Sequence, residues 1–215
     1  MSRALPVLLA LGALLVAGAS LWLLSRRTAP DVGAIAHARV GDIALAYEAG
    51  YARFAAGRGG GRLDRLDMAA TLPDFRPAGD ELRASGPDGR DPGLLFLSIA
   101  PAERSVDPAD RTAALYATFL EAEVVEDESG LIMRRFAAGS PYAGEDLYFD
   151  APEGRAFAAR CTRPTTPPDE LPQTCVVAFR LEGLDVDARF DRRALRHWPS
   201  IAHGARNLVR GMSAR

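Results

Sequence analysis

Very few side chains in this sequence could perform covalent or acid–base chemistry. The three histidines are His37, His197 and His203. His197 and His203 are six positions apart, which places them on different sides of a helix, and no Glu stands at metalloprotease spacing. All 26 basic residues are arginine, which excludes a P-loop lysine, a Schiff-base lysine and a kinase-type lysine. We therefore predict no catalytic residue, no cofactor-binding residue and no metal ligand.

Three other segments have compositions that can carry chemistry, but surface structure explains each of them better. The stretch 57–62 is Gly-rich yet lacks the spacing of either nucleotide-binding fingerprint, so we predict a flexible, exposed loop. The stretch 139–144 is not a nucleophile elbow, because Pro follows the Ser, and we predict a surface turn. The acidic run at 121–128 is predicted to face water.

The two cysteines, Cys161 and Cys175, are predicted to form a disulfide. They fall within one predicted β-hairpin, and their spacing fits no zinc pattern. A redox pair normally has only two residues between its cysteines, so a structural role is favoured. Structural disulfides need an oxidising compartment, which predicts that the domain lies outside the cytoplasm.

The first 27 residues predict a membrane address. Residues 4–24 contain no charge, and a helix of about 20 residues crosses a bilayer core of about 30 Å. A signal peptide cleaved before Ser20 is the alternative, because Ala17-Gly18-Ala19 fits a cleavage site. The apolar run continues to Leu24, which favours an uncleaved anchor.

Two signals conflict on the orientation of this anchor. Arg26 and Arg27 follow the predicted span and would by themselves place the domain inside the cell. The cysteine pair places it in the periplasm, and we give the cysteines more weight. The predicted localisation is the bacterial inner membrane, single-pass, with residues 1–27 as anchor or signal peptide. The anchor is predicted to be followed by a linker at 28–33 and by one periplasmic domain at 34–215.

The clearest local structure is a β-hairpin over residues 174–191. Apolar and polar side chains alternate from Leu184 to Asp191, and Glu182-Gly183 forms a two-residue loop. Pairing Leu181 with Leu184 puts the apolar residues of both strands on one face. Further strands are predicted at 43–47, 63–70, 94–100, 123–125, 131–136, 147–149 and 155–161.

Two helices are predicted to pack on this sheet. The first begins at the capping residue Asp107 and runs through 113–120. The second spans 191–212 and has one apolar side, and Pro199 should kink it or delay its start. Its arginines allow an alternative in which it rests on anionic lipid. Burial of apolar side chains is worth more than lipid attraction, so we predict Trp198 buried against the sheet and the arginines in solvent.

The predicted fold class is α+β: an N-terminal transmembrane helix followed by one mostly antiparallel β-sheet domain with two packed α-helices. Its hydrophobic content of 48% is that of a globular protein, and its net charge of −2 gives no basic field for nucleic acid.

A rigid, Pro-bracketed turn is predicted at 72–77, where the sequence is LPDFRP. A purely structural corner is the favoured interpretation, and the alternative is that the turn presents Phe75 or Arg76 to a partner. The predicted partners are the inner membrane, through residues 4–24, and another envelope protein. We predict no nucleic acid and no small-molecule cofactor.

The last sixty residues, with their two-cysteine hairpin and Leu195-x-x-Trp198 helix, resemble uncharacterised single-anchored periplasmic or envelope proteins of GC-rich bacteria. A similar tail occurs in periplasmic proteins thought to neutralise secreted toxins. The resemblance has no catalytic motif and carries no site residues with it.

These observations predict a non-enzymatic, membrane-tethered periplasmic domain that binds another envelope protein, as an assembly factor or a toxin-neutralising protein. The alternative is an envelope hydrolase whose Ser, Asp and His residues meet only in the fold. That alternative requires a histidine within hydrogen-bond reach of a Ser or a carboxylate.

Overall fold

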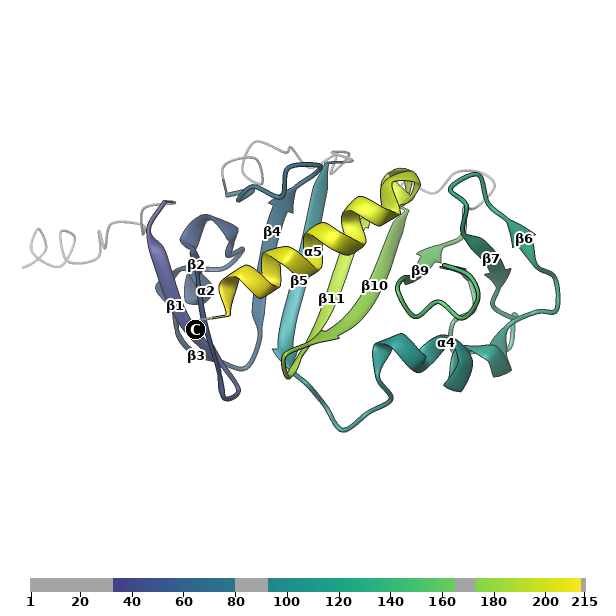
Figure 1. Ribbon diagram of the computed structural model, residues 1–215, viewed down its shortest axis with the longest axis horizontal. Helices are drawn as coiled ribbons and strands as arrows, with labels where there is room; N and C mark the ends of the chain where they lie inside the picture. Colours follow the sequence, from purple (N-terminus) through teal and green to yellow (C-terminus); the bar gives the residue numbers. More distant parts are fainter. Residues whose placement is uncertain (1–32, 80–92, 165–172, 214–215) are drawn as a thin grey trace, which may run out of the picture. The chain divides into compact units, whose positions relative to one another are not determined.

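An eight-stranded antiparallel sheet dominates the computed structural model, which describes residues 33–79, 93–164 and 173–213. All of these residues belong to one unit, Val32–Arg215. The strand order is β4-β5-β11-β10-β9-β8-β7-β6 (Figure 1). The strands are β4 (Leu66–Thr71), β5 (Leu94–Pro101), β6 (Val125–Glu126), β7 (Ile132–Arg135), β8 (Glu145–Phe149), β9 (Ala158–Thr162), β10 (Thr174–Leu181) and β11 (Leu184–Asp191).

The predicted hairpin is confirmed as β10 and β11. Leu181 pairs with Leu184 and Cys175 with Phe190, in the predicted register. The turn residues Glu182 and Gly183 both have positive φ, at 50° and 83°, as a two-residue hairpin loop of the twist-matching type requires. Because loop length and side-chain alternation specify the same register, these two strands are fixed by local sequence.

A second, three-stranded sheet has the order β2-β1-β3, formed by β1 (Ile35–Val40), β2 (Ile43–Glu48) and β3 (Gly61–Leu63). β1 and β3 were not predicted. The Gly-rich stretch predicted as a flexible loop is instead the short helix α2 (Ala55–Gly59) leading into β3. Gly60 lets β3 approach β1 closely, since a Cβ there would lie 2.3 Å from the carbonyl oxygen of His37.

The main hydrophobic core lies between the sheets and helix α5 (Trp198–Met212), which runs across one face of the large sheet (Figure 1). Residues Arg192–His197 form a 3₁₀ helix, η4, and the α-helix begins at Trp198, just before Pro199. Of the two predicted effects of Pro199, the structure shows the delayed start of the helix. The residues of α5 that are buried in this core are Ile201, Ala205, Val209 and Met212. They belong to the predicted apolar side of the helix.

Trp198 is half-buried, so the prediction of full burial is only partly met. Its ring packs against Phe157, with 5.2 Å between ring centroids, and its Nε1–H donates to the carbonyl oxygen of Ser129 at 3.2 Å. Arg206 was predicted to face solvent with the other arginines of this helix, but it is half-buried. Its guanidinium lies over the ring of Phe179 and donates to the carbonyl oxygens of Ala202 and Ala156.

The other face of the large sheet is covered only in part, by η2 (Pro108–Asp110), α4 (Arg111–Ala114) and η3 (Tyr116–Phe119). These pieces replace the first predicted helix, which was to run from Asp107 to residue 120. The predicted cap holds, since Asp107 accepts from the Ala109 N–H at 2.9 Å, but the helix breaks at Leu115, whose φ is −126°. Tyr116 turns onto Phe136 in a separate small core, so tertiary packing determines the local structure here.

Among residues 33–79, 93–164 and 173–213, no helix is both long enough and apolar enough to cross a membrane. The predicted fold class, with a transmembrane helix and two packed helices, is therefore wrong. The described part of the chain is mostly antiparallel sheet with few helices, of which α5 is the long one. The segment 4–24, over which the span was predicted, lies outside the described residues.

Candidate functional site

The two cysteines form the predicted disulfide. Both residues, Cys161 and Cys175, are buried. They lie opposite one another on β9 and β10. The disulfide therefore joins two neighbouring strands in the core and is part of the scaffold.

The turn that follows β4, residues 72–77, is held by several hydrogen bonds. The Phe75 N–H donates to the Thr71 carbonyl oxygen at 2.7 Å, and the Thr71 N–H donates to the Arg76 carbonyl oxygen at 2.9 Å. The Tyr51 hydroxyl donates to the Phe75 carbonyl oxygen at 2.8 Å. The Leu72–Pro73 peptide is cis. The turn is thus an ordered corner of the fold.

Phe75 and Arg76, the two residues considered as partner contacts, point to different surroundings. The Phe75 ring packs so closely on α5 that a Cβ at Gly204 would lie 2.1 Å from the tip of the ring. Arg76 is exposed, and its guanidinium lies 3.7 Å from the carboxylate of Asp74. Phe75 therefore anchors the turn to α5, and only Arg76 is presented to solvent.

A cavity of about 320 Å³ opens between this turn and the start of α5. Its apolar wall is formed by residues from the turn and from the helical segment: Leu72, Pro73, Ala194 and Ile201. Its remaining lining consists of Gly93 and four polar residues: Arg193, Arg196, His197 and Ser200. The anchoring of Phe75 on Gly204 sets the distance between the two walls.

The polar lining of the cavity is basic. Arg193 donates to Asp191, the capping residue of η4, and this guanidinium is the main cause that holds the pKa of the Asp191 carboxyl below its ordinary value. Arg196 is exposed, and its Nε–H donates to Nε2 of His197 at 3.0 Å. No Asp or Glu is among the described residues that line the cavity. An apolar group carrying negative charge is the ligand that this lining complements.

The histidines do not form a hydrolytic site. His37, His197 and His203 are all exposed. Among the described residues, the rings of these three histidines form a single hydrogen bond, between His197 and Arg196. The described residues also contain no group of three His, Cys, Asp or Glu that could hold a metal ion. The hydrolase alternative therefore gains no support from the histidines.

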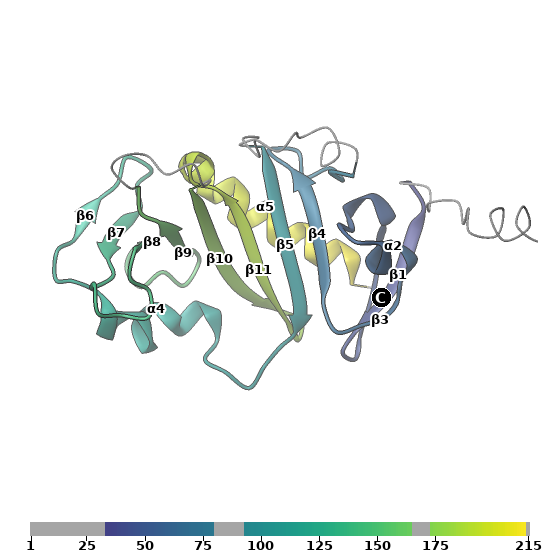
Figure 2. The same ribbon diagram turned by 180° about the vertical axis from the view of Figure 1, so that it is seen from behind.

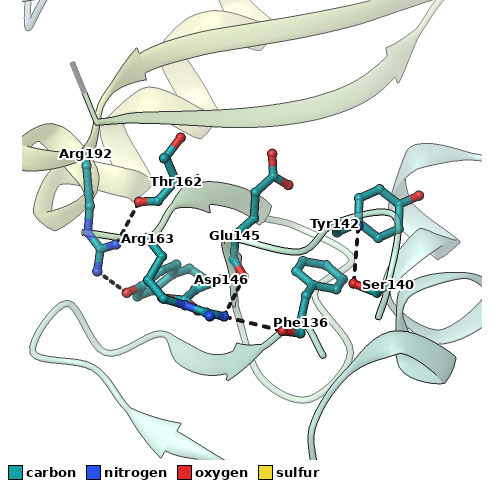
Figure 3. Close-up of polar contacts among 9 residues, drawn as sticks. Phe136, Ser140, Tyr142, Glu145, Asp146, Thr162, Arg163 and Arg192 are labelled. Carbon is teal, nitrogen blue, oxygen red and sulfur yellow. Dashed lines mark hydrogen bonds and ion pairs between the residues drawn. The ribbon is translucent and has the colours of Figure 1, made fainter. Parts of the chain in front are cut away.

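A second polar cluster, at β8 and β9, was missed by the sequence analysis (Figure 3). Arg163 donates to the buried carboxylate of Asp146 at 2.9 Å and to the carbonyl oxygen of Glu145 at 3.1 Å. Arg192 donates to the hydroxyl of Tyr148, whose pKa is raised by burial. These arginines satisfy polar groups within the fold, so we assign them a structural role.

Two solved structures have the same fold. Smlt3025, an immunity protein of the type IV secretion system of Stenotrophomonas maltophilia, matches with a TM-score of 0.60 and 14% identity, covering 85% of this chain and 94% of that one. FrpD, an iron-regulated outer membrane lipoprotein of Neisseria meningitidis, matches with a TM-score of 0.53 and 13% identity, covering 86% and 95%. No protein-family profile and no curated protein sequence matches the chain. At these identities the likeness establishes the fold.

Proposed function

We propose that this protein is a non-enzymatic binding protein of the bacterial envelope that neutralises a toxin by binding it. The observation that carries the proposal is the fold, shared over nearly the whole length of an immunity protein of a type IV secretion system. The second structural neighbour is an outer membrane lipoprotein, which supports the envelope as the location.

The proposed location of the domain is the periplasm. Its disulfide is the supporting observation, because structural disulfides persist in oxidising compartments and are rare in the cytosol. Thiol labelling of freshly trapped cells tests the location: no free cysteine should be found in the unreduced, denatured protein. Two labelled thiols would overturn both the disulfide and the compartment.

The proposed binding site is the cavity between the turn at 72–77 and α5. Its volume is at the lower end of the range of about 300–1,000 Å³ typical of ligand sites, and it is open to a single large apolar side chain. Burying such a side chain gains about 1.5–3 kcal/mol. Because the polar lining is basic, we propose that the inserted side chain belongs to an acidic segment of the partner. Arg76 is exposed on the same turn, where it is paired with Asp74.

Site-specific photocrosslinking in the bacterium that encodes the protein tests this function. A photoreactive amino acid replaces Ser200, which lines the cavity, and in a matched control it replaces Asn207, which is exposed on α5 outside the cavity. The expected result is one crosslinked protein at position 200 and not at 207. Mass spectrometry identifies it, and co-expression of the wild-type chain should suppress its toxicity.

The contrary outcome is equally specific. If no protein crosslinks at either position, and the purified chain hydrolyses an envelope substrate, the protein is an enzyme and the proposed function fails.

A further inference from the structure

The sheet face that points away from α5 carries a second group of exposed side chains. Figure 2 shows β4, β5, β11 and β10 from this side, with no helix in front of them. Arg53, Phe54, Phe96 and Arg189 lie together here, and we call them the arginine–aromatic row. None of these four residues is among the described residues that line the cavity beside α5, so the row is a separate surface.

Arg53 is the centre of the row, and the fold holds it in place. Its guanidinium carbon lies 5.4 Å from the ring centroid of Phe54 and 4.6 Å from that of Phe96. Its backbone is fixed from both sides, since its N–H donates to the Asp67 carbonyl oxygen and its own carbonyl oxygen accepts from Arg58 at 3.1 Å. The guanidinium is thus ordered before any partner arrives.

Arg189 extends the row across the sheet. It lies directly opposite Phe96 in the pairing of β11 with β5, and its side chain is exposed. Within residues 33–79, 93–164 and 173–213, neither Arg53 nor Arg189 forms an ion pair with a carboxylate. The acids beside the row are Asp67, which is bonded to Arg65, Asp191, which is bonded to Arg193, and the exposed Asp187.

Phe54 gives the row its apolar part, because 55% of this residue is exposed. An exposed Phe beside an ordered Arg is the side-chain combination found in the energetic centres of protein interfaces, which are enriched in aromatic residues and Arg. A guanidinium that contacts rings through its face keeps N–H donors at its edge, where a planar carboxylate accepts two of them.

We propose that the arginine–aromatic row is a second docking surface, which binds a carboxylate-bearing, partly apolar surface of the partner protein. The carboxylate pairs with Arg53, and the apolar part covers Phe54. This inference rests on the proposed function, because it assumes a protein partner. It adds that the partner contacts the row as well as the cavity beside α5.

The test uses the full chain with a photoreactive amino acid at Phe54. The matched control has it at Ile35, which is 58% exposed but lies on β1, outside the row. In parallel, Arg53→Glu is compared with Arg104→Glu, which makes the same charge change at an exposed loop position. The partner identified by crosslinking is then purified, and the affinity of both variants for it is measured at two salt concentrations.

The proposal expects the partner identified by mass spectrometry to crosslink at position 54 and not at 35. Arg53→Glu should weaken its binding by about tenfold or more, as the loss of an interface hot spot does, and Arg104→Glu should change it by less than about twofold. Binding by the wild type should weaken at high salt.

Crosslinking at position 200 but not at 54, with unchanged affinity for Arg53→Glu, overturns this inference and leaves the proposed function intact. Crosslinking of position 54 to a second copy of the chain also overturns it. If no protein crosslinks at 54 or at 200, both proposals fail.

Discussion

The contact between Phe75 and Gly204 determines how the turn at 72–77 sits on α5, and a single methyl group can test it. In Gly204→Ala the new Cβ would lie between 2.1 and 2.7 Å from three atoms of the Phe75 ring. Ordinary carbon contacts are 3.4–4 Å, so the ring has to withdraw by about 1 Å. Phe75 has little freedom to do so, because its φ of 55° and its backbone hydrogen bonds hold it.

The free energy of this substitution is the sum of two opposing effects. Overpacking of a well-packed contact costs about 1–3 kcal/mol. Replacing Gly by Ala inside a helix gains about 1 kcal/mol. Gly204→Ala should therefore destabilise the protein by up to about 2 kcal/mol. In a Phe75→Ala background the clash is gone, and the same substitution should stabilise the protein by up to about 1 kcal/mol.

Urea unfolding of the wild type, the two single variants and the double variant, followed by circular dichroism, measures this reversal of sign. The coupling free energy should be about 1–3 kcal/mol. If Gly204→Ala has the same effect in both backgrounds, Phe75 does not pack on α5. The wall of the cavity would then be placed wrongly.

Three further predictions concern other parts of the fold. Replacing both Cys161 and Cys175 by Ala should lower the free energy of unfolding by about 3 kcal/mol, since the bond closes a loop with a sequence separation of 14; equal melting temperatures with and without reductant would contradict this. The hydrogen bond from Arg180 lowers the pKa of Asp185 below 3.8, so its stabilising effect is present above pH 3.8 and lost as the pH falls through the lowered pKa. Arg180→Gln should raise that pKa in an NMR titration. Trp198→Ala should cost about 2–3 kcal/mol in urea unfolding, less than a fully buried Trp because the residue is half-buried, and no change would show that α5 is docked without it.

Local sequence predicted the elements whose signals agree with one another. The hairpin of β10 and β11 was predicted to the residue, because a two-residue loop and strict alternation require the same pairing. The disulfide was predicted from the hairpin that carries both cysteines, which is β9 with β10, where Cys161 and Cys175 lie opposite one another. The start of α5 followed from the geometry of Pro199, which is tolerated only in the first turn.

The failed predictions concern segments where distant contacts decide. The segment after Asp107 has a good cap, yet its helix breaks so that Tyr116 can pack on Phe136, a contact that no local pattern indicates. The Gly-rich stretch looked like a loop because Gly has a low propensity for both helices and strands. Gly60 is needed there for the close approach to His37, which depends on how β1 and β3 pair.

The candidate site was predictable only in part, for a similar reason. The rigid turn was recognised from its prolines, but the orientation of Phe75 depends on Gly204, a gap in the surface of α5 that lies far away in the sequence. The basic lining comes from Arg193, Arg196 and His197, and of these only Arg196 belongs to the predicted solvent-facing arginine stripe of the C-terminal helix. Their position beside an apolar cavity depends on the tertiary packing of the turn against this helical segment.

The central claim is that the protein neutralises a partner by binding it in the cavity beside α5. The most direct test is a calorimetric titration with the purified partner that crosslinking at position 200 identifies. Three chains are compared: the wild type, Ser200→Trp, which fills the cavity from its exposed rim, and Asn207→Trp, which adds the same side chain elsewhere on α5. The account predicts at least about tenfold weaker binding for Ser200→Trp alone, with unchanged melting temperatures. Equal affinity of all three chains would contradict it.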